Sequence, residues 1–140
     1  MKLARTVVTR LVEAARAAQV NAYAPYSRFR VGAAVLAADG RVFPGCNLEN
    51  GSLGLTVCAE RNAVAAAVVA GARPVAVAVV TDQDYVGPCG ACRQVLSEFE
   101  PAMPVVLVAR DGGRPRTTTL ARLLPGAFRF DPPAPAKRRS

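Results

Sequence analysis

The spacing of apolar residues predicts a helix followed by a β-hairpin in the first third of the chain. Apolar side chains recur every three or four positions over residues 3–19, the pattern of an amphipathic helix. The apolar run at residues 29–37 predicts a strand, and Asp39-Gly40 predicts a tight turn. Residues 41–46 are then expected to form the returning strand of the hairpin.

The rest of the chain alternates between helical and strand-like composition. Alanine-rich or amphipathic segments predict helices, and short β-branched runs predict strands that are buried on both faces. Because strands joined through helices favour parallel pairing, we expect an α/β fold in which helices cover both faces of a sheet. The expected elements are a loop at 47–56, helices at 58–70, 89–99 and 120–124, and strands at 75–80 and 105–109.

Length and composition limit the domain organisation. The chain has 140 residues, of which 51% are hydrophobic, enough for one domain with its own core. We expect this domain to span residues 1–130. Residues 131–140, DPPAPAKRRS, combine proline with a short basic run, which predicts a disordered basic tail.

The lengths of the apolar segments and the charges near the N-terminus indicate the cellular location of the protein. Each is interrupted by Arg, Gly or Pro before it reaches the length that spans a bilayer. The charges of residues 1–20 are spread through that segment, unlike those of a signal peptide. We therefore expect a cytoplasmic protein without membrane contact, whose cysteines stay reduced.

The chain contains no histidine, which narrows the chemistry that it can perform. A Ser-His or Cys-His nucleophile pair, an imidazole base and a His-bound metal are all excluded. Acid–base chemistry near neutral pH must then depend on a carboxylate, a thiol, a lysine or a tyrosine. Four cysteines in a reducing compartment are more typical of metal ligands or catalytic groups than of disulfides.

Three cysteines lie in two short motifs, CAE at 58–60 and PCGAC at 88–92. Each motif falls at the predicted start of a helix, and two such starts can converge at one crevice of an open sheet. Three thiolates leave one tetrahedral position free, as in catalytic zinc sites, and a water there becomes acidic near neutral pH. The motifs match the zinc-deaminase signature in its all-cysteine form. The alternative is a closed structural zinc site or simply buried cysteines.

Residues close to Cys58 complete the expected site. Glu60 faces the metal if Cys58 lies just before the helix, and would then carry the water proton to the substrate. Three thiolates on a divalent cation leave a net negative charge, which we expect the helix N-termini and Arg61 to offset. Cys46 ends a predicted strand and is expected to be a small buried hydrophobic residue outside the metal site.

Three segments agree in order and spacing with one known family, and a fourth, near 123–128, also fits it. They are YSRFRVGAAV at 26–35, GCNLENGSLGLTVCAER at 45–61, PCGACRQVLSEF at 88–99 and LLPGAF at 123–128. With these segments the sequence resembles the small, homotetrameric class of zinc-dependent cytidine deaminases over nearly all of residues 1–130. The resemblance implies a three-layer α/β/α sandwich around a mixed five-stranded sheet. It also implies a Zn²⁺ cofactor and hydrolytic deamination of cytidine and deoxycytidine to uridine and deoxyuridine, with loss of ammonia, in pyrimidine salvage.

The same resemblance implies individual residue roles. Cys58, Cys89 and Cys92 would be zinc ligands, and Glu60 would carry protons. The implied substrate-binding residues are Phe29 beside the base, Asn47 and Glu49 at the ribose hydroxyls, Ala59 through its backbone, and Phe128, which in relatives reaches a neighbouring subunit's site. Without the resemblance, Asn47 would be interpreted as a turn cap, Glu49 as a solvated carboxylate, Phe29 as a core residue and Phe128 as a C-terminal anchor.

A few positions depart from the family pattern. Leu53 stands where relatives often carry tyrosine, and Gly51 where alanine is usual. Gly87 precedes the second motif at a position where serine is common. The loop around Leu53 is therefore expected to differ in its contacts.

Three alternative functions share some of these sequence features. A deaminase of blasticidin-type antibiotic nucleosides would share the cysteine motifs, although the CNLEN segment at 46–50 favours a plain nucleoside. A polynucleotide deaminase would suit the net charge of +8, but the basic excess lies in residues 101–140, away from the motifs. We therefore expect no nucleic-acid partner. A non-enzymatic zinc module would have no use for Glu60.

Overall fold

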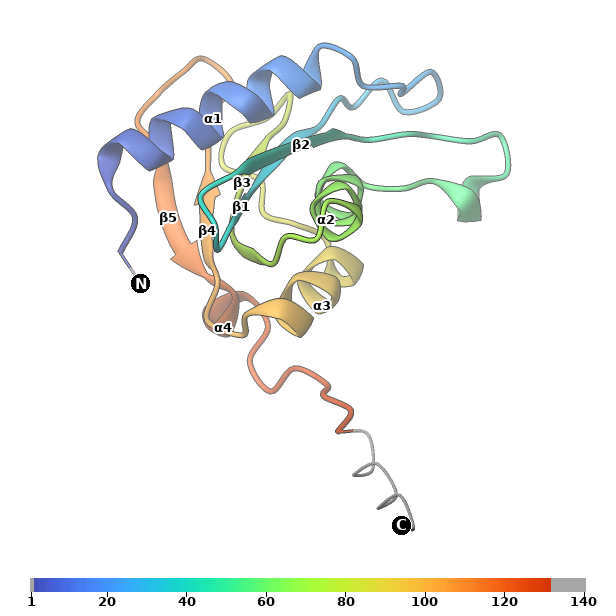
Figure 1. Ribbon diagram of the computed structural model, residues 1–140. Helices are drawn as coiled ribbons and strands as arrows, with labels where there is room; N and C mark the ends of the chain where they lie inside the picture. The colour runs from blue at the N-terminus through green and yellow to red at the C-terminus, as the bar shows by residue number, and fades with distance from the viewer. Residues whose placement is uncertain (1, 132–140) are drawn as a thin grey trace, which may run out of the picture.

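The computed structural model describes residues 2–131 and contains one five-stranded sheet with helices on both faces (Figure 1). The sheet order is β2-β1-β3-β4-β5. Among the described residues, no helix has both the length and the apolar character needed to span a membrane. The elements are α1 (Arg5–Gln19), β1 (Gly32–Ala37), β2 (Val42–Cys46), the 3₁₀ helix η1 (Leu53–Leu55), α2 (Ala59–Val69), β3 (Pro74–Val80), α3 (Gly90–Phe99), β4 (Pro104–Leu107), β5 (Arg116–Thr119) and α4 (Leu120–Leu123).

The three-layer arrangement predicted for the fold is confirmed. Alternate residues of the central strands point to opposite faces of the sheet, and each face has its own apolar core. α1 covers one face, and α2, α3 and α4 cover the other (Figure 1). The core under α1 includes Leu11, Ala15, Ala34, Ala78 and Val106, and the core under α2 and α3 includes Val35, Ala63, Val77, Leu96 and Val105.

Strand pairing corrects the expectation of parallel neighbours. Only β3 and β4, which α3 connects, form a parallel pair, whereas β1 pairs antiparallel with both β2 and β3. β2 and β3, which α2 connects, do run in the same direction, but β1 lies between them. Strands joined through a helix thus run in the same direction, as expected. β2 and β3 are not neighbours, however, because β1, the hairpin partner of β2, lies between them.

The fifth strand was not located by the sequence pattern. β5 has the sequence RTTT, pairs antiparallel with β4 and lies at the edge of the sheet. Its residues are exposed or half-buried, so it lacks the apolar run by which buried strands are recognised. The predicted strand at 29–37 is also shorter in the structure, beginning at Gly32.

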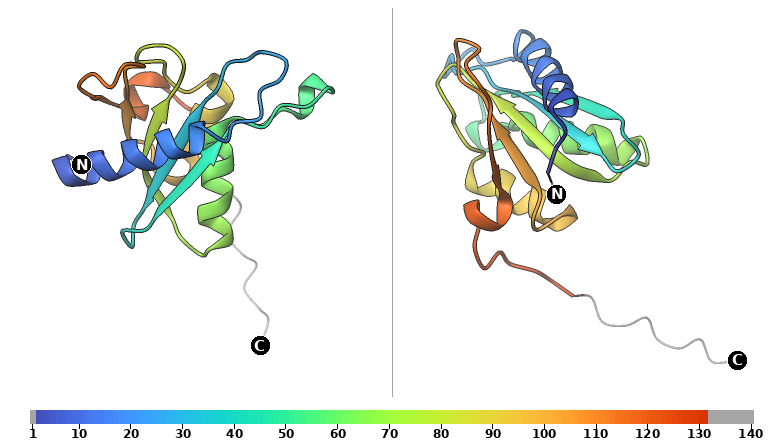
Figure 2. Two further views of the ribbon diagram at one scale, coloured as in Figure 1. Left: turned by 90° about the horizontal axis from the view of Figure 1, so that it is seen from above. Right: turned by 90° about the vertical axis from the view of Figure 1, so that its left-hand side faces the viewer.

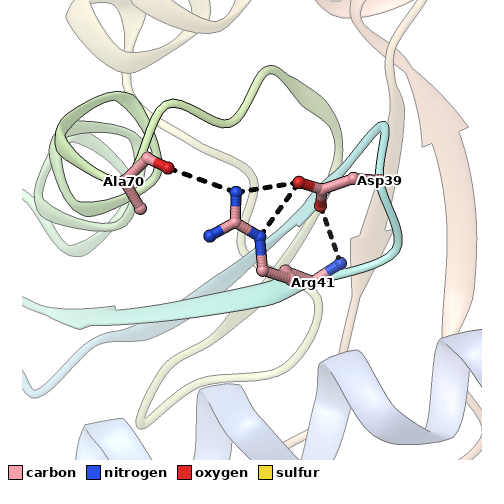
Figure 3. Close-up of polar contacts among 3 residues, drawn as sticks. All are labelled: Asp39, Arg41 and Ala70. Carbon is pink, nitrogen blue, oxygen red and sulfur yellow. Dashed lines mark hydrogen bonds and ion pairs between the residues drawn. The ribbon is translucent and has the colours of Figure 1, made fainter.

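The predicted hairpin turn is confirmed and is tied to α2. Gly40 has a φ of +87°, which favours glycine, and Asp39 accepts hydrogen bonds from the backbone N–H and the guanidinium of Arg41. The same guanidinium donates to the carbonyl of Ala70, just after α2, at 3.2 Å (Figure 3). The Arg41 guanidinium also lowers the pKa of the Asp39 carboxyl, chiefly through its hydrogen bond.

Two glycines allow the helices to approach the sheet closely. A Cβ at Gly32 would stand 1.9 Å from the carbonyl oxygen of Ala15 in α1. A Cβ at Gly45 would stand 2.4 Å from the carbonyl oxygen of Ala59, in the first turn of α2. Since real Cβ atoms do not come this close to backbone, glycine is required at both places. The contact at Gly45 sets the start of α2 against β2.

The segment between β2 and α2 lies beside the segment that follows α1. Tyr23 forms an isolated parallel bridge with Leu48, and η1 extends beyond the helix-sheet body (Figure 2). The tail expected to be disordered at 131–140 falls, apart from Asp131, outside the described residues.

Candidate active site

The two cysteine motifs converge at the starts of α2 and α3. Cys58 and Cys89 are the N-cap residues of these helices and have extended backbones, while Cys92 lies in the first turn of α3. Cys58 is therefore outside the helix, as the sequence argument requires for Glu60 to face the same site. The three sulfur atoms all lie within 4.8 Å of one another, and those of Cys58 and Cys89 are 3.8 Å apart.

This sulfur cluster fits a zinc ion. With Zn–S bonds of about 2.3 Å, tetrahedral geometry places two thiolates about 3.8 Å apart. Three soft sulfur donors without a fourth cysteine match the donor set of a site that keeps one position for water. Cys46, the remaining cysteine, is not part of the cluster, although it is half-buried rather than fully buried as predicted.

The Cys58 thiol is polarised toward ionisation. Hydrogen bonding with the Cys92 thiol lowers the pKa of Cys58 to about 5, and the Arg61 guanidinium adds to this effect. The pKa of Cys92 is correspondingly raised, first by its hydrogen bond with Cys58 and then by burial. The pair thus holds one proton between two sulfurs, so a thiolate is available to a cation near neutral pH.

Arg61 supplies positive charge to the cluster. One terminal nitrogen lies 3.7 Å from the Cys58 sulfur. The Nε atom of Arg61 is buried and has no hydrogen-bond partner among the described residues. Arg61 as a whole is half-buried, but a buried, unused donor on a cation is costly unless negative charge lies beside it. Three thiolates around a divalent cation would provide that charge, which is a second reason why the site fits zinc.

Glu60 is the buried carboxyl of the site. Its exposed fraction is 4%, and burial raises its pKa above the usual range for a carboxyl. A raised pKa brings protonation closer to neutral pH, where a carboxyl can both accept and return a proton. No other acidic side chain in the cavity described below is buried.

A cavity of about 280 Å³ opens beside the sulfurs and Glu60. This volume is at the small end of ligand pockets and suits one small molecule. Six of the ten residues predicted for the site lie on its wall. Ala59 and Cys92 are fully buried and do not line it, and neither do Arg61 and Phe128, of which Phe128 is 71% exposed. The lining residues are Ser27, Phe29, Val31, Asn47, Glu49, Thr56, Cys58, Glu60, Val79, Thr81, Val86, Gly87 and Cys89.

Asn47 and Glu49 line the cavity from the segment that follows β2. The Asn47 amide accepts from the N–H of Val31 at 2.9 Å and donates to the carbonyl of Phe29 at 2.8 Å. One further donor and one further acceptor site of this amide stay available. The amide therefore holds the segment that carries Phe29 in place while lining the cavity.

Ser27 is a lining residue that sequence reasoning missed. Its hydroxyl and N–H both donate to the Glu49 carboxylate, which also accepts from the N–H of Tyr26. The Ser27 hydroxyl is the main reason why the pKa of Glu49 is lowered. Ser27 lies two residues before Phe29 in a segment already singled out, so its position was a usable signal. Thr81 also lines the cavity, and the only sequence indication of this was its position directly after a buried strand, at the edge where open sheets bind ligands.

These features of the fold and the site define a class of protein. A three-thiolate set beside a buried carboxyl, at two helix starts on one edge of an α/β/α sheet, is the centre of a zinc-dependent hydrolase with a small substrate cavity. Residues 5–109 match the family model described as the cytidine and deoxycytidylate deaminase zinc-binding region. The chain belongs to this family.

Individual relatives agree with the family assignment. A cytidine deaminase of Sporosarcina psychrophila is 50% identical over 124 residues, which cover 86% of this chain and 90% of that protein. The crystal structure of a cytidine deaminase from Burkholderia pseudomallei superposes with a TM-score of 0.81 at 50% identity, covering 86% of this chain and 98% of that one. The Mycobacterium tuberculosis cytidine deaminase structure gives a TM-score of 0.74 at 45% identity, covering 87% and 97%.

Proposed function

We propose that this protein catalyses the hydrolytic deamination of cytidine and deoxycytidine to uridine and deoxyuridine, releasing ammonia, as a zinc-dependent enzyme of pyrimidine salvage. The observation that carries the proposal is the convergence of three sulfurs within 4.8 Å at a cavity whose wall includes Cys58, Cys89 and the Glu60 carboxyl, which is only 4% exposed. The curated relatives reported above are named cytidine deaminases. They do not favour the antibiotic-nucleoside alternative.

Cys58, Cys89 and Cys92 would hold the zinc ion. The chemistry that zinc supplies when bound is the acidification of the attacking water. Arg61 donates toward the Cys58 sulfur and reduces the negative charge of the three thiolates. The positive ends of α2 and α3, whose first turns carry the ligands, act in the same direction.

Glu60 moves the proton. Its carboxylate accepts a proton from the attacking water and delivers it to ring nitrogen N3 as the oxygen adds to C4. It then carries the remaining proton of that oxygen to the amino nitrogen, which leaves C4 as ammonia. One C–O bond forms and one C–N bond breaks, so water and cytidine give uridine and ammonia. The raised pKa of Glu60 supports both steps, because the carboxyl holds the proton between them.

The cavity wall would orient the nucleoside. Phe29 is half-buried in the lining and offers an aromatic face to the base. Ala59 is fully buried beside Cys58 and is not a lining residue, so its proposed backbone contact with the pyrimidine rests on the family resemblance. Asn47 retains free hydrogen-bonding capacity, and Glu49 stays ionised as its pKa is lowered. An amide and a carboxylate together suit the ribose hydroxyls.

We infer that the working enzyme is a homotetramer with shared sites. Phe128 is 71% exposed and does not line this chain's own cavity, which suits a residue that reaches a neighbouring subunit. Several other large apolar side chains are also exposed and would be covered by assembly. They are Val20, Tyr23, Leu48, Leu53 and Leu55.

The remaining aspects of the proposal concern the whole chain. Residues 1–130 would form the deaminase domain, and the protein would act in the cytoplasm, where the ligand cysteines stay reduced. A nucleoside rather than a polynucleotide is the proposed substrate. A cavity of about 280 Å³ suits one nucleoside, and few aromatic residues are present to stack a strand of bases.

The deciding experiment is a direct assay of the purified protein. Mixing it with cytidine should lower the ultraviolet absorbance of the cytosine base while ammonia appears in equal amount. Chelation should abolish the reaction, and added Zn²⁺ should restore it. Single-stranded DNA and RNA should not be deaminated. A zinc-loaded protein that leaves both cytidine and deoxycytidine unchanged would contradict the proposal.

A further inference from the structure

Cys89 is the proposed ligand that side-chain packing restrains least. Cys92 is buried and Cys58 is half-buried, but Cys89 is exposed. The segment 81–88 before it contains neither helix nor strand. The Cys89 side chain also makes no capping hydrogen bond to α3. The position of its sulfur must therefore depend on how the backbone around residue 89 is held.

Arg93 holds that backbone on both sides of the cysteine. Its Nε atom donates to the carbonyl of Pro88 at 2.7 Å, and its own backbone N–H donates to the carbonyl of Cys89 at 2.9 Å. These carbonyls belong to the two peptide planes that flank the Cys89 Cα. One residue therefore fixes the orientation of both planes and, with them, the direction of the Cys89 side chain.

The rest of the guanidinium connects this loop to other parts of the molecule. The NH1 atom donates to the carbonyl of Leu123, at the end of α4, at 2.8 Å. The NH2 atom lies 3.4 Å from where a Cβ of residue 87 would stand, so it packs against the cavity wall. The planar guanidinium of arginine can donate in both directions at once, toward Pro88 and toward Leu123, which the single ammonium of a lysine cannot.

The neighbouring side chain extends the same connection. Gln94 donates from Nε2 to the carbonyl of Phe128 at 3.0 Å. Two consecutive residues of α3 thus hold the chain that leaves α4. The segment that carries Phe128 and the loop that carries Cys89 are therefore both hydrogen-bonded to the same turn of α3.

The role of Arg93 is geometric rather than electrostatic. The ion pairs within residues 2–131 are Asp39–Arg41 and Arg73–Glu100, so the Arg93 side chain is held by carbonyls and not by a carboxylate. Arg61 contributes to the pKa shifts of Cys58, whereas Arg93 contributes to neither Cys58 nor Cys92. Its contribution to the site is therefore expected to depend on hydrogen-bond geometry and not on charge alone.

We propose that Arg93 is a positioning residue that presents Cys89 to zinc and couples the metal-binding loop to the C-terminal segment. This inference rests on the proposed assignment of Cys89 as a ligand. It predicts that Arg93 sets the affinity of the site for zinc even though it touches neither the metal nor the substrate.

The test compares Arg93→Lys and Arg93→Met with wild type. Zinc affinity is measured on the full-length protein by competition with a chelator of known strength, and folding is checked by circular dichroism. Both substitutions should weaken zinc binding by about 10- to 100-fold, the usual effect of removing a group that orients a ligand. Lysine should not rescue binding, since its single ammonium cannot donate to the carbonyls of Pro88 and Leu123 in the two directions that the guanidinium serves.

A matched control removes an arginine from a neighbouring place. Arg122 lies exposed on α4, and its side chain makes no hydrogen bond within the described residues. Arg122→Met should bind zinc like wild type. In Co²⁺-exchanged protein, the thiolate-to-cobalt absorbance should fall in the Arg93 variants and stay unchanged in the Arg122 variant. A purely structural role would lower thermal stability without changing this spectrum.

The outcomes separate this inference from the ligand assignment. Cys89→Ala should lose zinc, and its retention of full zinc affinity would overturn the assignment of Cys89 itself. If Cys89→Ala loses zinc while folded Arg93→Lys and Arg93→Met keep wild-type affinity, the positioning role of Arg93 is wrong. Failure of both Arg93 variants to fold would also contradict it, because Arg93 would then be a folding residue.

Discussion

Replacement of Glu60 by glutamine tests the proposed mechanism most directly. Glutamine has nearly the same shape, so the buried position should stay filled, but an amide cannot accept and return a proton. Glu60 is 4% exposed, so bulk water has little access to replace it. Glu49, the other acidic residue of the lining, is engaged by Ser27 and Tyr26.

The size of the effect follows from these contacts. A general acid–base group usually contributes about 10²- to 10⁴-fold to turnover. Because no second buried carboxyl lines the cavity within the described chain, we expect the upper part of that range for Glu60→Gln. A loss of about 10⁴-fold corresponds to about 5.4 kcal/mol in activation free energy. Since Glu60 acts on the transition state, kcat should fall far more than KM changes.

The assay follows the loss of cytidine absorbance at several substrate concentrations, with zinc content measured on the same samples. Glu98→Gln makes the same chemical change on the exposed side of α3 and should leave kcat, KM and zinc unchanged. Turnover of the zinc-loaded Glu60→Gln protein within tenfold of wild type would refute the proton-transfer role.

The remaining predictions concern the fold and the other cysteine. Gly32→Ala should lower the free energy of unfolding by about 3 kcal/mol or more in a denaturant titration, because its Cβ would overlap the Ala15 carbonyl; an unchanged midpoint would contradict this. Cys46→Ala should keep one zinc per chain by elemental analysis, and loss of that zinc would make Cys46 a ligand. Asp39→Asn should lower the melting temperature slightly near neutral pH. Since Arg41 lowers the folded-state pKa of Asp39, this difference should be present above the unfolded-state pKa and vanish as the pH falls through the folded-state pKa; a constant difference would exclude the ion pair as its cause.

Local pattern was sufficient to predict most elements of this protein. The period of apolar residues located α1, and the Asp39-Gly40 pair located the hairpin turn. The residues directly around the CAE and PCGAC motifs were enough to place both motifs at helix starts. These features depend on the conformation of short segments, which sequence determines directly.

Contacts between distant segments depended on the tertiary structure. The placement of β1 between β2 and β3, and the edge strand β5, follow from how the sheet assembles rather than from any one segment. The same is true of the Ser27–Glu49 contact and of the Arg93 contacts to residues 88 and 123. Sequence thus determined which chemical groups are available, namely four thiols, ten carboxyl side chains and no imidazole. Only packing decided that Cys58 and Cys89, 31 positions apart, lie 3.8 Å from each other, because that distance depends on two helices meeting the same edge of one sheet.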